Sequence, residues 1–103
     1  MSKIQQVTSA GPAVIVFDLI AWDDEDDPRG NVQHIAANGL SIEEVEQALL
    51  DPANRPIVSR STGRTAVFGM TATGKVIFVV YEVIQTKPVI VIRPITAYEP
   101  VPE

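Results

Sequence analysis

The segment Lys75–Ile84 most constrains the fold of this chain, because it is apolar at both its odd and its even positions. In an extended strand these positions fall on two sides, with Ile77, Val79 and Val83 on one side and Val76, Phe78, Val80 and Ile84 on the other. A strand that is apolar on both sides is typical of the interior of a sheet. The segment therefore predicts a central β-strand.

Three further strands are predicted after Pro56, where apolar residues recur with a period of two. They are Ile57–Ser61, Arg64–Met70 and Pro88–Ile95. The connections Ser61-Thr62-Gly63 and Thr71-Ala72-Thr73-Gly74 are typical of hairpins, since each ends in glycine. Pro94 has no N–H to donate within a sheet, so we expect the last strand to lie at an edge or to carry a bulge there.

The first half of the chain predicts one strand and a short helix. Ala13–Ile20 is short and rich in β-branched residues, which is typical of a strand. Asp27 can cap a helix that has Pro28 in its first position, runs to about Asn38 and stops at Gly39.

A second helix has the clearest local signal in the sequence. Ser41 is suited to the N-cap position, and Glu44 three residues later completes a capping box. Asp51-Pro52 is expected to end this helix.

These elements predict an α+β fold with the order β-α-α-β-β-β-β. We expect one antiparallel sheet with the two N-terminal helices packed on a single face, and no C-terminal helix. At 103 residues the chain is expected to be a single domain, 1–103, with a core at about 13–98. The ends, 1–10 and 99–103, are expected to be flexible.

The charges are sorted along the chain. Residues 1–54 hold ten acidic side chains against Lys3 and Arg29, a net charge of −8, whereas residues 55–93 hold six basic side chains against Glu82, a net charge of +5. The last ten residues add −2, which gives the total of −5. A domain with one acidic and one basic part can present a cationic face to an anionic partner.

Composition excludes several kinds of site. The chain has no cysteine, so it has no disulfide, and its one histidine has no carboxylate at ligand spacing. The acidic run Asp23–Asp27 lacks the spacing of a calcium loop and is better read as a solvated loop that caps a helix. No cofactor, metal or membrane segment is expected, and no signal peptide is recognised. We therefore expect a cytoplasmic protein.

Two arginines and a tyrosine make the candidate site. If Thr71–Gly74 is a four-residue turn, Arg64 lies across from Tyr81, on the same face as Phe68 and Val79. Arg93 joins that face or the opposite one, depending on the length of the next connection. Such a cluster could hold a phosphodiester and stack a base. The alternative is that these are surface arginines over an exposed sheet face, with Tyr81 packed at its rim.

His34 lies on the first predicted helix. A neutral imidazole could act as a general acid or base near pH 7. The alternative is a hydrogen-bonded surface histidine.

Several local strings share one order and spacing over about residues 14–98. They are Phe17–Asp23; Gly39–Glu44 followed by Asp51-Pro52; Gly63–Met70; Thr73–Lys75 followed by Val79–Tyr81; and Ile92–Ala97. In that order and spacing the chain resembles the BrnT-type toxins of bacterial toxin–antitoxin pairs, which belong to the RelE/ParE-like ribonuclease fold. The resemblance implies a cytoplasmic partner of an antitoxin that cleaves RNA when it is free.

The resemblance also assigns individual residues. Arg64 and Arg93 fall where the family has arginines, Tyr98 stands where it has a further arginine, and His34 stands where it usually has asparagine. The family's final basic helix is replaced by Glu99–Glu103, in which two prolines prevent a helix.

The resulting hypothesis is a toxin-related protein whose metal-independent ribonuclease activity is weak or lost. Arg64 and Arg93 would stabilise charge in the transition state, and Tyr81, Tyr98 or His34 would transfer protons. Further RNA contacts are expected from Arg60, Lys75 and Tyr98.

Two alternatives stay open. One is a non-enzymatic module whose basic sheet face binds an acidic peptide or protein, with exposed edge strands that could also take a partner by strand addition. The other is a homodimer that uses Phe78, Val80 or the last edge strand.

Overall fold

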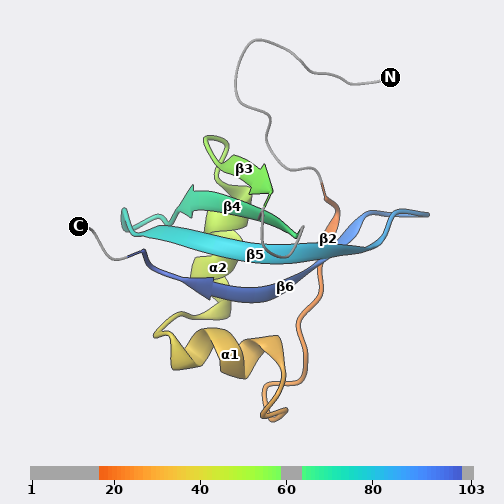
Figure 1. The fold of residues 1–103 in the computed structure, drawn as a ribbon, viewed down its shortest axis with the longest axis horizontal. Helices are drawn as coiled ribbons and strands as arrows, with labels where there is room; N and C mark the ends of the chain where they lie inside the picture. The colour runs from red at the N-terminus through yellow and green to blue at the C-terminus, as the bar shows by residue number, and fades with distance from the viewer. Residues whose placement is uncertain (1–16, 59–63, 101–103) are drawn as a thin grey trace.

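A computed structural model describes residues 17–58 and 64–100 of the chain (Figure 1). Its elements are β2 (Leu19–Ile20), α1 (Asn31–Ala37), α2 (Ile42–Leu50), β3 (Arg55–Val58), β4 (Thr65–Met70), β5 (Val76–Gln85) and β6 (Val91–Tyr98). The predicted order β-α-α-β-β-β-β is confirmed. Parts of two predicted strands, residues 13–16 and 59–61, and the connection at 61–63 lie outside the described residues, as do 1–10 and 101–103 of the predicted ends.

The strands form one five-stranded sheet in the order β2-β6-β5-β4-β3. Neighbouring strands from β3 to β6 are antiparallel, but β2 pairs with β6 in parallel. The prediction of a purely antiparallel sheet is therefore wrong, and the sheet is mixed. The reason is that the two helices carry the chain from β2 to the far edge of the sheet, so that β6 returns beside β2 only at the end. β5 occupies the centre, as its sequence predicted.

α2 begins and ends where the sequence predicted. The Glu44 N–H donates to Ser41 Oγ over 3.1 Å, and the Ser41 N–H donates to Glu44 Oε1 over 3.0 Å, which completes the capping box. At the other end, Asp51 accepts hydrogen bonds from the N–H groups of Ala53 and Met70, so that its side chain links the helix to the end of β4.

Among the described residues, no helix is long and apolar enough to cross a membrane.

α1 begins three residues later than Pro28, the first helical position that the sequence predicted. Its N-cap is Gly30, which has no capping side chain. The Asn31 N–H donates to the Asp23 carboxylate and the Asp23 N–H donates to the Asn31 side chain, each over 2.8 Å, and this exchange fixes the start of the helix. Asp27 is therefore not the cap; its side chain accepts a hydrogen bond from the Arg29 N–H within the preceding loop.

The two helices contact different parts of the sheet. α2 packs across β4 and β5, whereas α1 lies along β6 (Figure 1). Since β2 pairs only with Val91 and Ile92, the rest of the outer edge of β6 has no neighbouring strand among the described residues. The side-chain amides of Asn31 and Asn38 donate to the carbonyl groups of Pro94 and Ala97, each over 2.8 Å. The α1 region thus supplies hydrogen-bond donors to two backbone carbonyl groups on this edge of β6.

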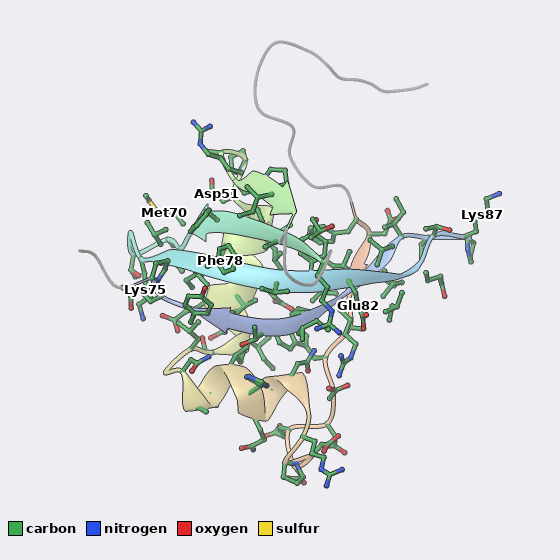
Figure 2. The ribbon with its side chains drawn as sticks, viewed as in Figure 1. Asp51, Met70, Lys75, Phe78, Glu82 and Lys87 are labelled. Atoms are coloured by element: carbon green, nitrogen blue, oxygen red, sulfur yellow. The ribbon has the colours of Figure 1, made fainter. Side chains whose placement is uncertain are left out.

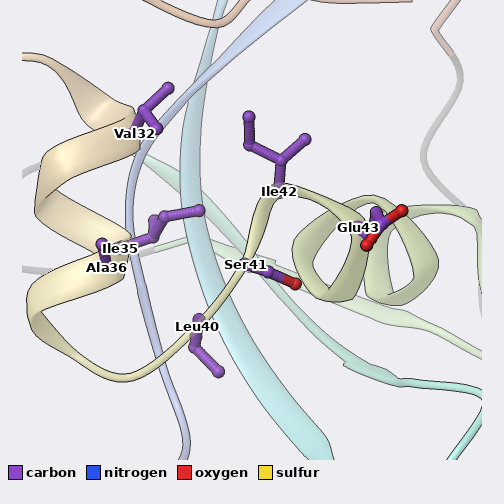
Figure 3. A pocket seen from close by; sticks show the side chains of 7 residues that line it. All are labelled: Val32, Ile35, Ala36, Leu40, Ser41, Ile42 and Glu43. Carbon is purple, nitrogen blue, oxygen red and sulfur yellow. The ribbon is translucent and has the colours of Figure 1, made fainter. Parts of the chain in front are cut away.

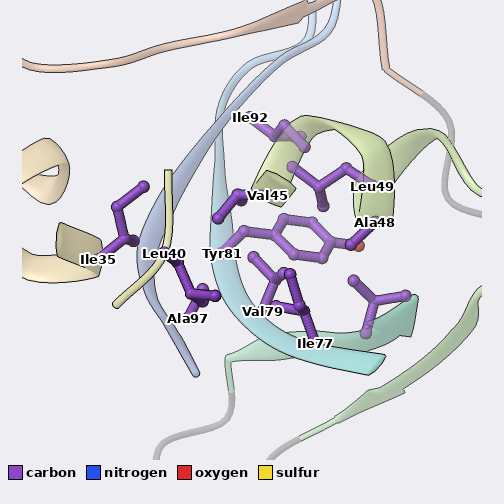
Figure 4. Packing of buried hydrophobic residues seen from close by; sticks show 11 residues of the cluster. Ile35, Leu40, Val45, Ala48, Leu49, Ile77, Val79, Tyr81, Ile92 and Ala97 are labelled. Carbon is purple, nitrogen blue, oxygen red and sulfur yellow. The ribbon is translucent and has the colours of Figure 1, made fainter. Parts of the chain in front are cut away.

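One hydrophobic cluster joins both helices to the same side of the sheet (Figure 4). The buried members of the cluster are Ile35, Leu40, Val45, Ala48, Leu49, Val67, Ile77, Val79, Tyr81, Ile92 and Ala97. α2 comes so close to β4 that a Cβ atom at Gly69 would overlap the backbone of Ala48. Glycine at this position thus sets the distance between the helix and the sheet.

We predict that Gly69→Ala destabilises the protein, because the added methyl group meets the backbone of α2 rather than a side chain that could move. Overpacking of this kind is expected to lower the free energy of unfolding by about 1–3 kcal/mol. Denaturant unfolding followed by circular dichroism measures the change. Met70→Ala, at the exposed next position of the same strand, is the control and should cost less. Equal stability of Gly69→Ala and the unsubstituted protein would contradict this packing.

Candidate functional site

The hairpin between β4 and β5 decides which side chains share a face. The Thr71 N–H donates to the Lys75 carbonyl over 2.8 Å, and the Gly74 N–H donates to the Thr71 carbonyl over 3.0 Å. Gly74 has a φ of 89°, a left-handed conformation that ends a three-residue loop. Met70 therefore pairs with Val76, and Thr65 pairs with Tyr81. The predicted four-residue turn was one residue too long, so the predicted register is wrong by one position.

This register places Tyr81 in the core. Its side chain lies on the helix side of the sheet and is 4% exposed, within the cluster that contains Val67 and Val79 (Figure 4). Burial raises the pKa of the Tyr81 phenol. Phe68 and Val79, expected on one face, lie on opposite faces. The prediction that Tyr81 lies across from Arg64 on an open face of the sheet is therefore wrong, and Tyr81 is a core residue.

Arg93 is held between two carboxylates. Its Nη2 lies 2.6 Å from Asp23 Oδ2, and its Nη1 lies 3.8 Å from Glu82 Oε2. The hydrogen bond from the Asn31 N–H, followed by that from Arg93, lowers the pKa of Asp23. The guanidinium thus has an evident structural role, since it connects β6 to the segment that starts α1.

The pairing of β5 with β6 fixes the face of Arg93. Arg93 is opposite Glu82, on the face away from the helices. β4 begins at Thr65, which pairs with Tyr81, so Arg64 precedes the strand, and it is exposed. The strand pairing therefore gives the face of Arg93 but leaves that of Arg64 open, as the sequence did.

The remaining predicted site residues are dispersed. Lys75 lies on the helix side, where its Nζ is 2.7 Å from Glu44 Oε2; this pair raises the pKa of Lys75 and lowers that of Glu44. His34 is exposed on α1. Arg60 lies outside the described residues. Tyr98 ends β6 on the face away from the helices. The structure therefore does not gather the predicted catalytic residues at one point.

Three aromatic rings make a row across the other face. Phe68, Phe78 and Tyr98 are directly opposite one another on β4, β5 and β6. The ring centroids are 4.8 Å apart for the first pair and 5.3 Å apart for the second. Figure 2 shows Phe78 near the middle of the sheet on the side that α2 does not cover. Phe68 is 37% exposed and Tyr98 is 43% exposed.

Aliphatic side chains extend this aromatic row. The register places Ile57, Met70, Val76 and Val80 on the same face as the three rings. We call these seven residues the open sheet face: Ile57, Phe68, Met70, Val76, Phe78, Val80 and Tyr98. The sequence analysis used the even-numbered apolar residues of β5 to predict a central strand, and it named Phe78 and Val80 as a surface for a homodimer. Both helices pack on the other side of the sheet. On this face Phe78 and Val80 are half-buried, and Ala66, beside Val80, is fully buried, whereas the other five members of the set are exposed.

A separate apolar groove of about 570 Å³ lies between the two helices. It is lined by Val32, Ile35, Ala36, Leu40, Ser41, Ile42 and Glu43 (Figure 3). It contains none of the predicted site residues, and its one ionisable group is Glu43.

Neither a metal site nor a known relative adds to this description. Among the described residues, no group of three or more histidine, aspartate or glutamate side chains could hold a metal ion. We found no family model, no curated protein and no solved structure that matches the chain.

We predict that Asp23→Ala destabilises the protein at neutral pH by about 1–3 kcal/mol, because Asn31 and Arg93 lose a charged acceptor. The pKa of Asp23 is lowered in the folded state, so its contribution is full above the unfolded-state value of about 4 and is lost as the pH falls through the folded-state value. Urea unfolding from pH 7 to pH 3 should show the difference from the unsubstituted protein shrinking at the acid end. Glu25→Ala, in the same exposed loop, is the control. A difference that does not change with pH would contradict the role of the ionised carboxylate.

Proposed function

We propose that this domain is a non-catalytic protein-interaction module that binds its partner on the open sheet face. The aromatic row of Phe68, Phe78 and Tyr98 carries the proposal. Contiguous exposed apolar patches mark interaction surfaces, whereas scattered apolar residues do not. Aromatic side chains supply much of the binding energy at such surfaces, and tyrosine is enriched among their strongest contributors.

The sheet behind the patch supports the proposal. Phe78 lies on the central strand, and its neighbours Ile77 and Val79 are fully buried against the helices. The backbone that carries the ring is therefore fixed by the core. A rigid surface loses little entropy when it binds, which favours affinity.

The edges of the sheet are less suited to a partner than its face. β3 is an edge strand, but Pro56 within it has no N–H to donate to an added strand. At the opposite edge, β2 is two residues long, and α1 satisfies two carbonyl groups of β6 beyond it. These features favour a partner on the face of the sheet, in a contact made by side chains.

The ribonuclease activity implied by the BrnT resemblance stays a prediction, and the described residues give it less support. Arg93 is balanced by Asp23 and Glu82, and the Tyr81 phenol is buried on the opposite side of the sheet. The binding of an antitoxin, which the resemblance also implies, would be one form of the proposed protein interaction.

We predict that peptides selected on this domain from a displayed random library bind the open sheet face. Phe78→Ser and Tyr98→Ser should each weaken a selected peptide at least tenfold, because they remove aromatic anchors. Calorimetric titration of the purified variants measures the affinity. Leu50→Ser is the matched control, since Leu50 is 66% exposed on α2, away from this face. Selected peptides that bind Phe78→Ser as well as the unsubstituted domain would overturn the proposal.

A direct assay distinguishes binding from catalysis. We predict that incubation with total RNA gives no discrete fragments that depend on Arg64 or His34. Gel analysis of RNA treated with the unsubstituted domain, Arg64→Ala and His34→Ala measures this. Fragments that appear with the unsubstituted domain and disappear with either variant would support the ribonuclease hypothesis instead.

A further inference from the structure

The two sides of the sheet carry different charges. On the helix side, α2 bears Glu43, Glu44 and Glu46 and no basic residue, and Asp51 follows at its end. Lys75 is the basic residue that meets this helix, and it is paired with Glu44. The side that bears α2 is thus predominantly acidic.

Arginine predominates on the opposite side. The register places Arg55 beside Phe68 and Arg93 opposite Glu82. Asp23 and Glu82 balance the charge of Arg93, whereas Arg55 lies on the edge strand β3. Arg55 is exposed, and within residues 17–58 and 64–100 it has no ion-pair partner.

We propose that the partner segment is an acidic amphipathic helix, whose apolar stripe covers the aromatic row and whose carboxylates face Arg55. This inference rests on the proposed function and specifies the chemistry of the partner. An arginine beside an apolar patch favours a carboxylate, because the guanidinium can donate two hydrogen bonds to it.

The apolar surface favours a helix over an extended peptide. A strand laid on side chains such as Phe78 and Val80 would leave its backbone N–H and C=O groups without partners. A helix satisfies these groups internally and offers a continuous apolar stripe. α2 already covers the other side of the same sheet in this way.

A protein partner is favoured over RNA by the side chains around the rings. Ile57, Met70, Val76 and Val80 extend the aromatic row with aliphatic surface. Nucleic-acid interfaces are more polar and more positively charged, and here Glu82 lies on the same face.

The test uses two synthetic 18-residue helical peptides as probes. Both carry the same leucine stripe, and the positions beside the stripe are Glu in one peptide and Lys in the other. We expect the unsubstituted domain to bind the Glu peptide more tightly in fluorescence anisotropy. Arg55→Glu should weaken the Glu peptide about fivefold and strengthen the Lys peptide. Lys87→Glu, the same change of charge at the tip of the β5–β6 hairpin, should leave both affinities unchanged (Figure 2).

Phe78→Ser separates failure of this inference from failure of the proposed function. If Phe78→Ser abolishes binding but Arg55→Glu alters neither affinity, the acidic partner is wrong and the interaction face stands. If Phe78→Ser leaves the binding of both peptides intact, the face itself is wrong. A Phe78-dependent dimer in sedimentation analysis, or tighter binding of an oligouridine than of either peptide, would also overturn the acidic helix.

Discussion

The pairing of Met70 with Val76 determines which side chains of the central strand meet the helices. Side chains alternate along a strand, so a shift of one residue would exchange the two faces of β4 relative to β5. In the observed register Val67 and Val79 are neighbours in the core, and Phe68 and Phe78 are neighbours outside it. Gly74, with its positive φ, permits the short loop that produces this pairing. The core and the open sheet face thus depend on the same turn.

The polar residues near the start of α1 show how charged groups can serve the fold. Asp23 accepts hydrogen bonds from Asn31 and Arg93, and Asn31 donates to the Pro94 carbonyl. These contacts connect the end of β2, the first turn of α1 and the bulged part of β6. An arginine that looks available in the sequence is therefore part of a structural network. The same contacts explain why α1 starts at Asn31 rather than near Asp27, because the tertiary partner outweighs the local cap.

Features that depend on neighbouring residues could be predicted, and those that depend on distant pairing could not. The capping box of Ser41 and Glu44 and the left-handed Gly39 are local, and both are present. At Pro94 the sequence predicted either an edge strand or a bulge, because proline has no N–H to donate. The structure has an irregularity there: Val80 pairs with Thr96, but the next residue, Tyr81, pairs with Pro94. The parallel pairing of β2 with β6 joins segments about seventy residues apart and has no local signal. For the candidate site, the central position of β5 was predictable, but the face that holds Tyr81 required the loop length.

A flat hydrophobic sheet invites association with other copies, and this molecule opposes that in two ways. Its edges are protected by Pro56 and by α1, and its net charge of −5 makes copies repel one another. The acidic α2 and the arginines on the opposite side also give the molecule a charge asymmetry. This asymmetry would orient the molecule so that an acidic helix first meets the open sheet face. The apolar stripe of that helix could then be buried against the aromatic row.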